Sequence, residues 1–430
     1  MAANDVPPRR AAAGGERTVP APDPFARDYL LLALRLDQRV PGLVDGYFGP
    51  ADLKAQVDLE QSRPPAGLRA DAADLIGRLD AEVAAPDRRE WLRVQLAALE
   101  AHARSLAGDP LPYVAHVARC FDLLPERTPE EVFAAAADEI DALLPAGAAT
   151  LPERISAWDE RFVVPPDRLR PLVDWLLARF RERAERLFSL PPGEAIQVGL
   201  VRGQPWTGYN WYDGGYRSRV DLNTDLPVRA ADLLTVLPHE AYPGHHTEHA
   251  WKEAELVEGR GWLEHAVLLI NAPECLLSEG LADLGRQFAV PEDEAPDLLV
   301  ELYDRAGLAV ARNPVEARDA AARQAAISRA LAAVRGVRGN AALLLHADGA
   351  PRDEVIRYLQ RWMLESPERA ARRIDFLEHP LWRTYVFAYF EGERLLRRWL
   401  ERVPPAGQPA RFGRLLREPL TPSGIVGELG

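Results

Sequence analysis

Cysteine is scarce in this chain. Among its 430 residues there are only two cysteines, Cys120 and Cys275, and they form no C-x-x-C pair. A disulfide scaffold requires several cysteines, and a thiolate zinc site requires clustered ones. The sequence therefore indicates neither kind of framework.

Long apolar runs and an excess of positive charge are also lacking. No apolar run reaches the ~18 residues that cross a bilayer, and residues 1–24 lack the apolar core of a signal peptide. We interpret 1–24 as a disordered tail, and we expect a cytoplasmic protein with no membrane partner. The net charge of −13 argues against nucleic acid as a partner, because phosphate binding requires clustered cations. The sequence gives no indication of the oligomeric state.

Helical patterns dominate what is present. Segments of about 15 residues with apolar positions at helical spacing alternate with joints that contain proline. The expected helices cover 25–39, 70–84, 88–107, 129–144, 152–160, 168–187, 232–258, 276–288, 292–313, 314–333, 352–364, 367–376 and 382–403. We expect a mainly α protein, a large helical bundle with an N-terminal lobe at 25–190 and a metal-bearing catalytic lobe at 191–420. Because no linker separates these lobes, one continuous domain is the alternative.

One segment differs from the helical pattern. Residues 208–225 combine aromatic side chains, a Gly-Gly turn signal and alternation over 218–223, which predicts a small antiparallel β-hairpin or sheet near the metal site. Two interpretations remain open. An exposed strand could pair with an extended peptide, or the hairpin could simply cover the core.

The segment from His239 to His246 reads His-Glu-Ala-Tyr-Pro-Gly-His-His and is the most informative of the chain. In the zincin signature H-E-x-x-H, two histidines at i and i+4 bind zinc, and the glutamate acts as general base on the metal-activated water. Here the i+4 position is Pro243. An ideal helix of about 100° per residue would put His245 roughly 120° off the face of His239. It would put His246 near that face, but about 10.5 Å further along the axis.

Pro243 and Gly244 predict that the helix opens between the histidines. Proline lacks the N–H that would bond the His239 carbonyl, and glycine tolerates unusual backbone angles. A widened, π-type turn would bring His245 back to the metal. Geometry alone leaves His245 and His246 as alternative ligands. A polar stripe on a surface helix is the alternative to a metal site, but the apolar approach over 232–238 favours a buried segment.

A catalytic zinc site needs a third protein ligand and leaves the fourth position to water. Glu279 is the best candidate, because it lies in an otherwise apolar helical segment about 40 residues after the first histidine. Asp283 follows one helical turn later on the same face. Its carboxylate would accept the N–H of a ligating histidine and fix the tautomer of that ring.

These motifs resemble two groups of proteins. The broader group is the gluzincin metallopeptidases, in which a glutamate ligand on a second helix follows H-E-x-x-H. The closer one is a bacterial family named domain of unknown function 885, with the hallmark H-E-x-x-P-G-H followed by an E-G helix. The matching residues are His239, Glu240, Pro243, Gly244, His245 and Glu279-Gly280. The resemblance implies a mainly helical, zinc-peptidase-like protein with a zincin-like active-site helix, and it favours His245 over His246.

Two tyrosines near the C-terminus are further candidates. Tyr385 and Tyr389 lie at i and i+4 on one face of a helix expected after Pro380. A phenol beside the metal could stabilise a developing oxyanion, although aromatic stripes at this spacing are more often core. The resemblance implies a Gln and a Y-x-x-G here. Tyr389 to Gly392 fits the second, whereas Tyr385 takes the place of the Gln.

Together these patterns predict a zinc-dependent hydrolase, most of all a metallopeptidase, with one Zn²⁺ per chain. His239, His245 and Glu279 would bind the ion, and Glu240 would be the general base acting on a peptide or other small amide. One alternative is a metal-dependent hydrolase of a non-peptide amide or ester. The other is a non-catalytic metal-binding helical protein.

Overall fold

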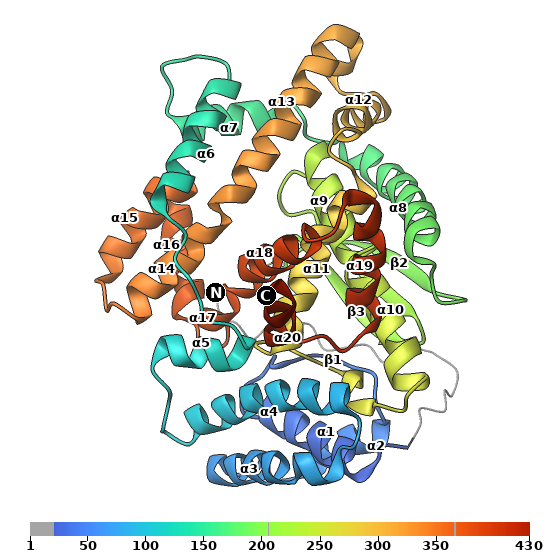
Figure 1. Cartoon of the computed structure of the whole chain (residues 1–430). Coiled ribbons are helices and arrows are strands. Elements are labelled where there is room, and N and C mark those ends of the chain that lie inside the picture. Colours follow the sequence, from blue (N-terminus) through green and yellow to red (C-terminus); the bar gives the residue numbers. More distant parts are fainter. Residues whose placement is uncertain (1–20, 205, 365–366) are drawn as a thin grey trace.

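The computed structural model describes residues 21–204, 206–364 and 367–430. The expectation of a mainly α fold is confirmed, because helices account for most of these residues and the two sheets are small (Figure 1). The α-helices are α1 (Pro24–Asp37), α2 (Ala51–Leu59), α3 (Pro65–Glu82), α4 (Pro86–Leu106), α5 (Tyr113–Phe121), α6 (Glu130–Leu143), α7 (Leu151–Glu160), α8 (Pro166–Phe188), α9 (Ala230–Glu240), α10 (His245–Lys252), α11 (Pro273–Ala289), α12 (Ala295–Arg305), α13 (Pro314–Ala333), α14 (Val337–His346), α15 (Arg352–Met363), α16 (Pro367–Glu378), α17 (Trp382–Tyr385), α18 (Ala388–Leu400), α19 (Gln408–Arg417) and α20 (Pro422–Leu429). The strands are β1 (Val44–Tyr47), β2 (Ala195–Val201), β3 (Gly208–Gly214), β4 (Arg217–Asn223) and β5 (Val267–Leu269).

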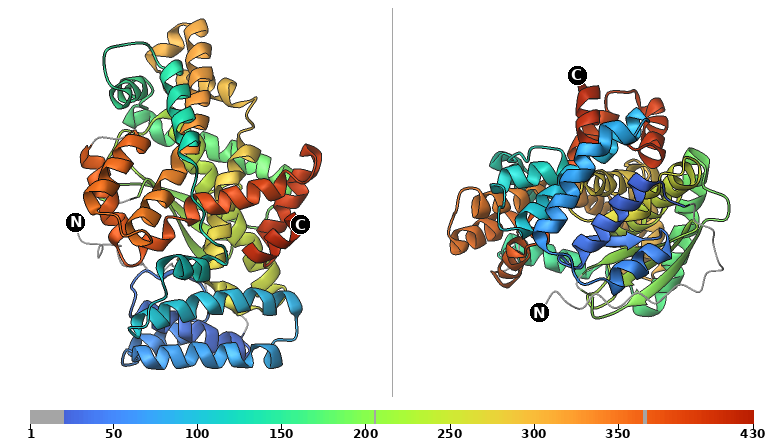
Figure 2. Two further views of the ribbon diagram at one scale, coloured as in Figure 1. Left: turned by 60° about the vertical axis from the view of Figure 1, so that its left-hand side comes forward. Right: turned by 90° about the horizontal axis from the view of Figure 1, so that it is seen from below.

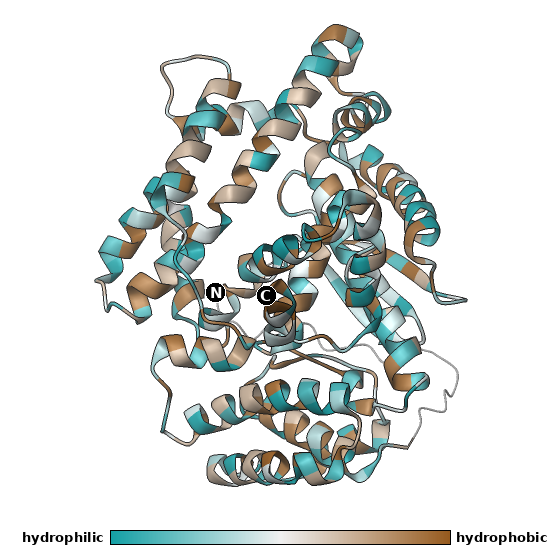
Figure 3. Cartoon of the chain, viewed as in Figure 1, coloured by the Kyte–Doolittle hydropathy of each residue, from teal (hydrophilic) through white to brown (hydrophobic). Residues whose placement is uncertain are grey.

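Amphipathic periodicity explains the surface helices. In α3, the buried residues are Leu68, Ala72, Leu75 and Leu79, a spacing of three to four that places them on one helical face. This face packs against α1 and α4. Figure 3 shows hydrophobic and hydrophilic residues alternating along the helices, as expected where one stripe is buried and the other is solvated.

The predicted hairpin is present and belongs to a larger sheet. Strands β3 and β4 are antiparallel, and Gly214 and Gly215 at their turn have φ of 74° and 64°, which glycine adopts without strain. A third strand that the sequence analysis missed, β2, pairs in parallel with β4, so that β3 lies at one edge. Strands β1 and β5 form a separate antiparallel pair.

The two expected lobes are interleaved. Helices α1 to α4 form a layer at the base of the molecule (Figures 1 and 2), but α6 packs against α13, and α8 packs against α9 and α12. In addition, β1 pairs with β5 across more than 200 residues of sequence. The packing therefore shows no break near residue 190 in the described part of the chain.

Candidate metal centre

The helix expected over 232–258 is interrupted between His239 and His245, as Pro243 and Gly244 predicted. Helix α9 ends at Glu240, α10 begins at His245, and the π-helical turn lies at Glu253–Glu258 rather than between the histidines. The Gly244 N–H bonds the Pro238 carbonyl at 2.9 Å. A Cβ at position 244 would lie 1.9 Å from the His239 carbonyl oxygen. Only glycine fits this tight turn, which redirects the chain so that the ring of His245 packs edge-on against that of His239, with centroids 4.7 Å apart.

A close contact between two helices positions Glu279, the third candidate ligand. A Cβ on Gly280 would lie 2.3 Å from the carbonyl carbon of Gly392, and a Cβ on Gly392 would lie 2.0 Å from the Leu276 carbonyl oxygen. Helices α11 and α18 therefore meet backbone to backbone at their glycines. This contact brings α17 and the start of α18, with Tyr385, against Glu279.

The structure brings His239, His245 and Glu279 together, with one ligand atom of each within 4.8 Å of the others. The Nε2 atom of His239 lies 3.5 Å from Oε2 of Glu279, and the Nε2 atom of His245 lies 3.8 Å from Oε1. Two ligand atoms of a tetrahedral zinc ion are about 3.4 Å apart, from bond lengths of ~2.0–2.2 Å. The three side chains are thus spaced almost as zinc ligands are.

The chemistry of the donor set also fits zinc. Glu279 is 7% exposed, and its Oε2 atom accepts no hydrogen bond within the described residues. A buried carboxylate oxygen with only the long 3.5 Å contact to His239 is poorly satisfied, and a bound cation would compensate its charge. Two imidazoles and one carboxylate are the protein ligands of many catalytic zinc sites.

An aspartate and an arginine orient His239. The Nδ1 atom of His239 donates to Oδ1 of Asp283 at 3.2 Å, and Arg335 pairs with the other oxygen of Asp283 at 2.6 Å. Nδ1–H is thus held on Asp283, and Nε2 is the nitrogen that faces Glu279 and would bind an ion. The structure therefore places Asp283 where the sequence predicted it. Arg335 was missed, since nothing in its local sequence points to α11.

Ser278 orients the ring of His245 by contacting its Nδ1 atom, as Asp283 does for His239. The Nδ1 atom of His245 lies 3.1 Å from Ser278 Oγ, and Ser278 donates to Glu248 at 2.5 Å. Lys252 then bridges Glu248 at 2.7 Å and Glu274 at 2.8 Å. Burial opposes it, but Lys252 and His265 lower the pKa of Glu274 to about 2. Sequence reasoning missed these contacts, although Glu-x-x-x-Lys at 248–252 was a readable signal.

The other two histidines of the segment lie outside the cluster. His246 is fully buried and points away, since its Nε2 lies 2.8 Å from Glu194 and its Nδ1 lies 2.8 Å from Ser218. Both of its nitrogens are therefore engaged. His249 stacks on His245 with ring centroids 5.8 Å apart, and burial lowers its pKa to about 4. His245, Glu248 and His249 also lie close together, but Lys252 already neutralises Glu248.

Glu240, the expected general base, is 9% exposed and lies beside the two histidines. Burial raises its pKa, whereas the neighbouring charges of His239 and His245 lower it, and the net direction is upward. Strand β3 covers this residue. A Cβ on Gly208 would lie 3.2 Å from Cγ of Glu240, and Asn210 donates to the Glu240 carbonyl at 2.7 Å.

Of the two tyrosines, only Tyr385 contacts the cluster through a hydrogen bond between described side chains. Its hydroxyl donates to Oε1 of Glu279 at 2.6 Å. Tyr389 packs edge-on against Tyr385 with ring centroids 4.9 Å apart. Burial raises the pKa of both phenols, so both remain protonated and able to donate.

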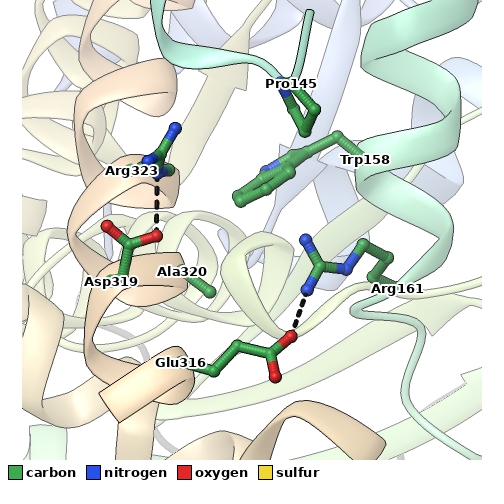
Figure 4. A pocket seen from close by; sticks show the side chains of 7 residues that line it. All are labelled: Pro145, Trp158, Arg161, Glu316, Asp319, Ala320 and Arg323. Atoms are coloured by element: carbon green, nitrogen blue, oxygen red, sulfur yellow. Dashed lines mark hydrogen bonds and ion pairs between the residues drawn. The ribbon is translucent and has the colours of Figure 1, made fainter.

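A pocket of about 350 Å³ lies elsewhere, between α7 and α13 (Figure 4). Its charged side chains pair with one another, Arg161 with Glu316 at 2.8 Å and Arg323 with Asp319 at 2.9 Å. Trp158 at its wall donates to Gln324 at 2.7 Å. The pocket therefore presents satisfied polar groups and lacks the convergent titratable residues of the histidine cluster.

Comparisons with known proteins concern the fold alone. No protein-family model matches the sequence, and no curated protein matches it. One similar solved structure is "the putative lipoprotein from Colwellia psychrerythraea", with a TM-score of 0.51 and 17% sequence identity, over 91% of this chain and 68% of that chain. At this identity the likeness shows a shared fold. Within the described residues, no helix has both the length and the apolar character needed to cross a bilayer.

Proposed function

We propose that the protein is a zinc-dependent hydrolase, and specifically a metallopeptidase. The observation that carries the proposal is the convergence of His239, His245 and Glu279, from three helices, with Glu240 beside them. A purely structural zinc site usually closes with four protein ligands. Three ligands next to a buried carboxylate are typical of a catalytic site, in which one position serves the reaction.

His239, His245 and Glu279 would hold the ion, which when bound would polarise a carbonyl and lower the pKa of a coordinated water. The chain supplies the remaining chemistry. Glu240, whose pKa burial raises, would take up a proton and return it to a leaving amine. The hydroxyl of Tyr385 lies at the edge of the cluster. It would donate a hydrogen bond to the oxyanion that develops on the substrate carbonyl.

Strand β3 supports a peptide as substrate. It is one of the two edge strands of its sheet, and its first residue, Gly208, packs over Glu240. An extended peptide that added to this edge through main-chain hydrogen bonds would pass beside the histidine cluster. This placement favours the substrate-binding interpretation of the hairpin over a purely structural one, and it favours peptides over small esters.

The direct test is Glu240→Gln in full-length, zinc-loaded protein, assayed on a peptide library and on a panel of non-peptide amides and esters. Loss of a proton acceptor that acts in the rate-limiting step should lower kcat by about 10²–10⁴-fold, with the zinc content unchanged. Glu292→Gln is the matched control, because this carboxylate is exposed and pairs only with Arg329 among the described residues. Turnover of esters but not peptides would replace the peptidase by the alternative hydrolase. Absence of any turnover in zinc-loaded wild-type protein would overturn the proposal.

A further inference from the structure

A second group of ligand-type side chains lies apart from the histidine cluster. His102 is on α4, and His116 and Cys120 are one turn apart on α5, at the i and i+4 spacing that lets two residues bind one ion. The three residues are 8%, 5% and 0% exposed. One ligand atom of each lies within 4.8 Å of the others.

The separation between the sulfur and the nitrogen fits a shared ion. The Sγ atom of Cys120 lies 3.8 Å from Nε2 of His102. Bond lengths of about 2.3 Å for Zn–S and ~2.0–2.1 Å for Zn–N give a sulfur–nitrogen separation of about 3.6 Å in a tetrahedral site. The contact between Ser105 Oγ and His116 Nδ1, at 3.4 Å, is longer than a good hydrogen bond.

A backbone carbonyl completes the group. The carbonyl oxygen of Asn271 lies 3.2 Å from Nε2 of His102, where it accepts a hydrogen bond from that ring. The same separation is close to the ~3.4 Å between nitrogen and oxygen ligands of one zinc ion. Asn271 adopts φ of 57°, a left-handed conformation uncommon outside glycine. Its side chain donates to the Leu381 carbonyl at 2.7 Å. The carbonyl is thereby held toward His102.

We propose that His102, His116 and Cys120 bind a second transition-metal ion, with Zn²⁺ as the ion that suits two imidazoles and a thiolate, and with the Asn271 carbonyl as fourth donor. Binding converts the Cys120 thiol to a thiolate, forms the sulfur–metal bond and releases one proton to solvent. His102 then carries its proton on Nδ1. The sequence alone did not indicate this centre, because Cys120 lies 18 residues after His102 and on a different helix.

The ionisation states are compatible with this centre. Burial lowers the pKa of His102 and lowers that of His116 to about 3. Both rings are therefore neutral, as a ligand must be. Burial raises the pKa of Cys120 to about 12, with the charge of Arg383 opposing it. The thiol would remain protonated without an ion, and a bound cation would deprotonate it.

An ion at this centre would cross-link three segments of the fold. The four donors come from α4, from α5 and from the segment that immediately precedes α11, the helix that carries Glu279. An ion here would fix the start of α11 relative to the base layer of helices. Such a centre would have four protein donors, the number that structural zinc sites use.

Cobalt substitution tests this centre independently of any activity. Full-length protein produced in zinc-depleted, cobalt-supplemented medium would acquire Co²⁺ while it folds, so that burial does not block entry. The histidine cluster has no thiolate ligand. A sulfur-to-cobalt charge-transfer band in the wild-type protein, with two ions per chain, would therefore report the Cys120 centre. No such band in the wild-type protein would overturn the proposal, whatever the behaviour of the variants.

Variants assign the band. It should disappear in Cys120→Ala, with loss of one of two ions, and should remain in Cys275→Ala, the matched control that removes the only other cysteine. It should also remain in His239→Ala, which disrupts only the histidine cluster. A band that survived in Cys120→Ala, or that was lost in Cys275→Ala, would contradict the assignment. If Cys120→Ala fails to fold, Cys120→Ser with Cys275→Ser as its control gives the same comparison.

Discussion

The contact between α11 and α18 allows a sharp prediction, because one kind of substitution should have opposite effects at two glycines. A Cβ at Gly280 would lie 2.3 Å from the carbonyl carbon of Gly392 and 2.6 Å from its oxygen. These are backbone atoms that no rotamer change can move. The helices must separate by roughly 1 Å to restore ordinary contact, and overpacking of this kind costs about 1–3 kcal/mol, occasionally more.

Gly77 is the matched control. It lies within α3 and is exposed, and a Cβ at this position would meet no atom within 4 Å outside its own stretch of helix backbone. Alanine in a helix interior is favoured over glycine by about 0.5–1 kcal/mol. Gly77→Ala should therefore stabilise the protein by that amount, whereas Gly280→Ala should destabilise it by about 2 kcal/mol. Urea unfolding of the two variants measures the difference.

Separation of α11 from α18 should also disturb the candidate metal centre. Moving α18 away from α11 draws Tyr385 from Glu279, so Gly280→Ala should also weaken metal binding, measured by competition with a chelator. Equal unfolding midpoints for Gly280→Ala and Gly77→Ala would refute the backbone-contact argument. It would mean that the helices are not in the close register described.

Three further predictions concern the buried charges. Asp283→Ala should weaken zinc affinity by about 10–100-fold, since it removes the acceptor that orients His239; an unchanged affinity in a chelator titration would contradict this. Lys252→Met should destabilise the fold by about 3–5 kcal/mol, because it leaves the buried Glu248 and the half-buried Glu274 without the cation they share. An unchanged urea midpoint would exclude that role. The folded pKa of Glu274 is lowered from 4.5 to about 2, so its stabilisation is present above pH ~4.5 and is lost as the pH falls toward 2. Thermal melts of Glu274→Gln against pH should therefore lose part of the acid-induced decline seen in the wild-type protein.

Local rules predicted those parts of the structure that depend on neighbouring residues. The i,i+4 relation of Glu279 to Asp283 placed the aspartate correctly beside His239. Periodicity located α3, α4, α6 and α8 to within a few residues of their observed bounds, except that α3 begins five residues earlier than expected. The mainly α fold follows from these patterns.

Contacts between residues far apart in the sequence could not be predicted from helix and strand periodicity. Helix arithmetic assumed a continuous helix through Pro243, and so it could not choose between His245 and His246; the turn that separates α9 from α10 depends on how Gly244 fits against the His239 carbonyl. The partners of His246, Ser218 and Glu194, lie 28 and 52 residues away. Strand β2 was missed because its partner β4 follows only after another strand.

The central claim is that His239, His245 and Glu279 hold one metal ion. Elemental analysis by mass spectrometry of the purified wild-type protein beside His239→Ala and Glu279→Ala tests it most directly. We expect each variant to contain one zinc ion per chain fewer than the wild type, with an unchanged helical circular dichroism spectrum. Equal zinc content in all three folded proteins would contradict the account.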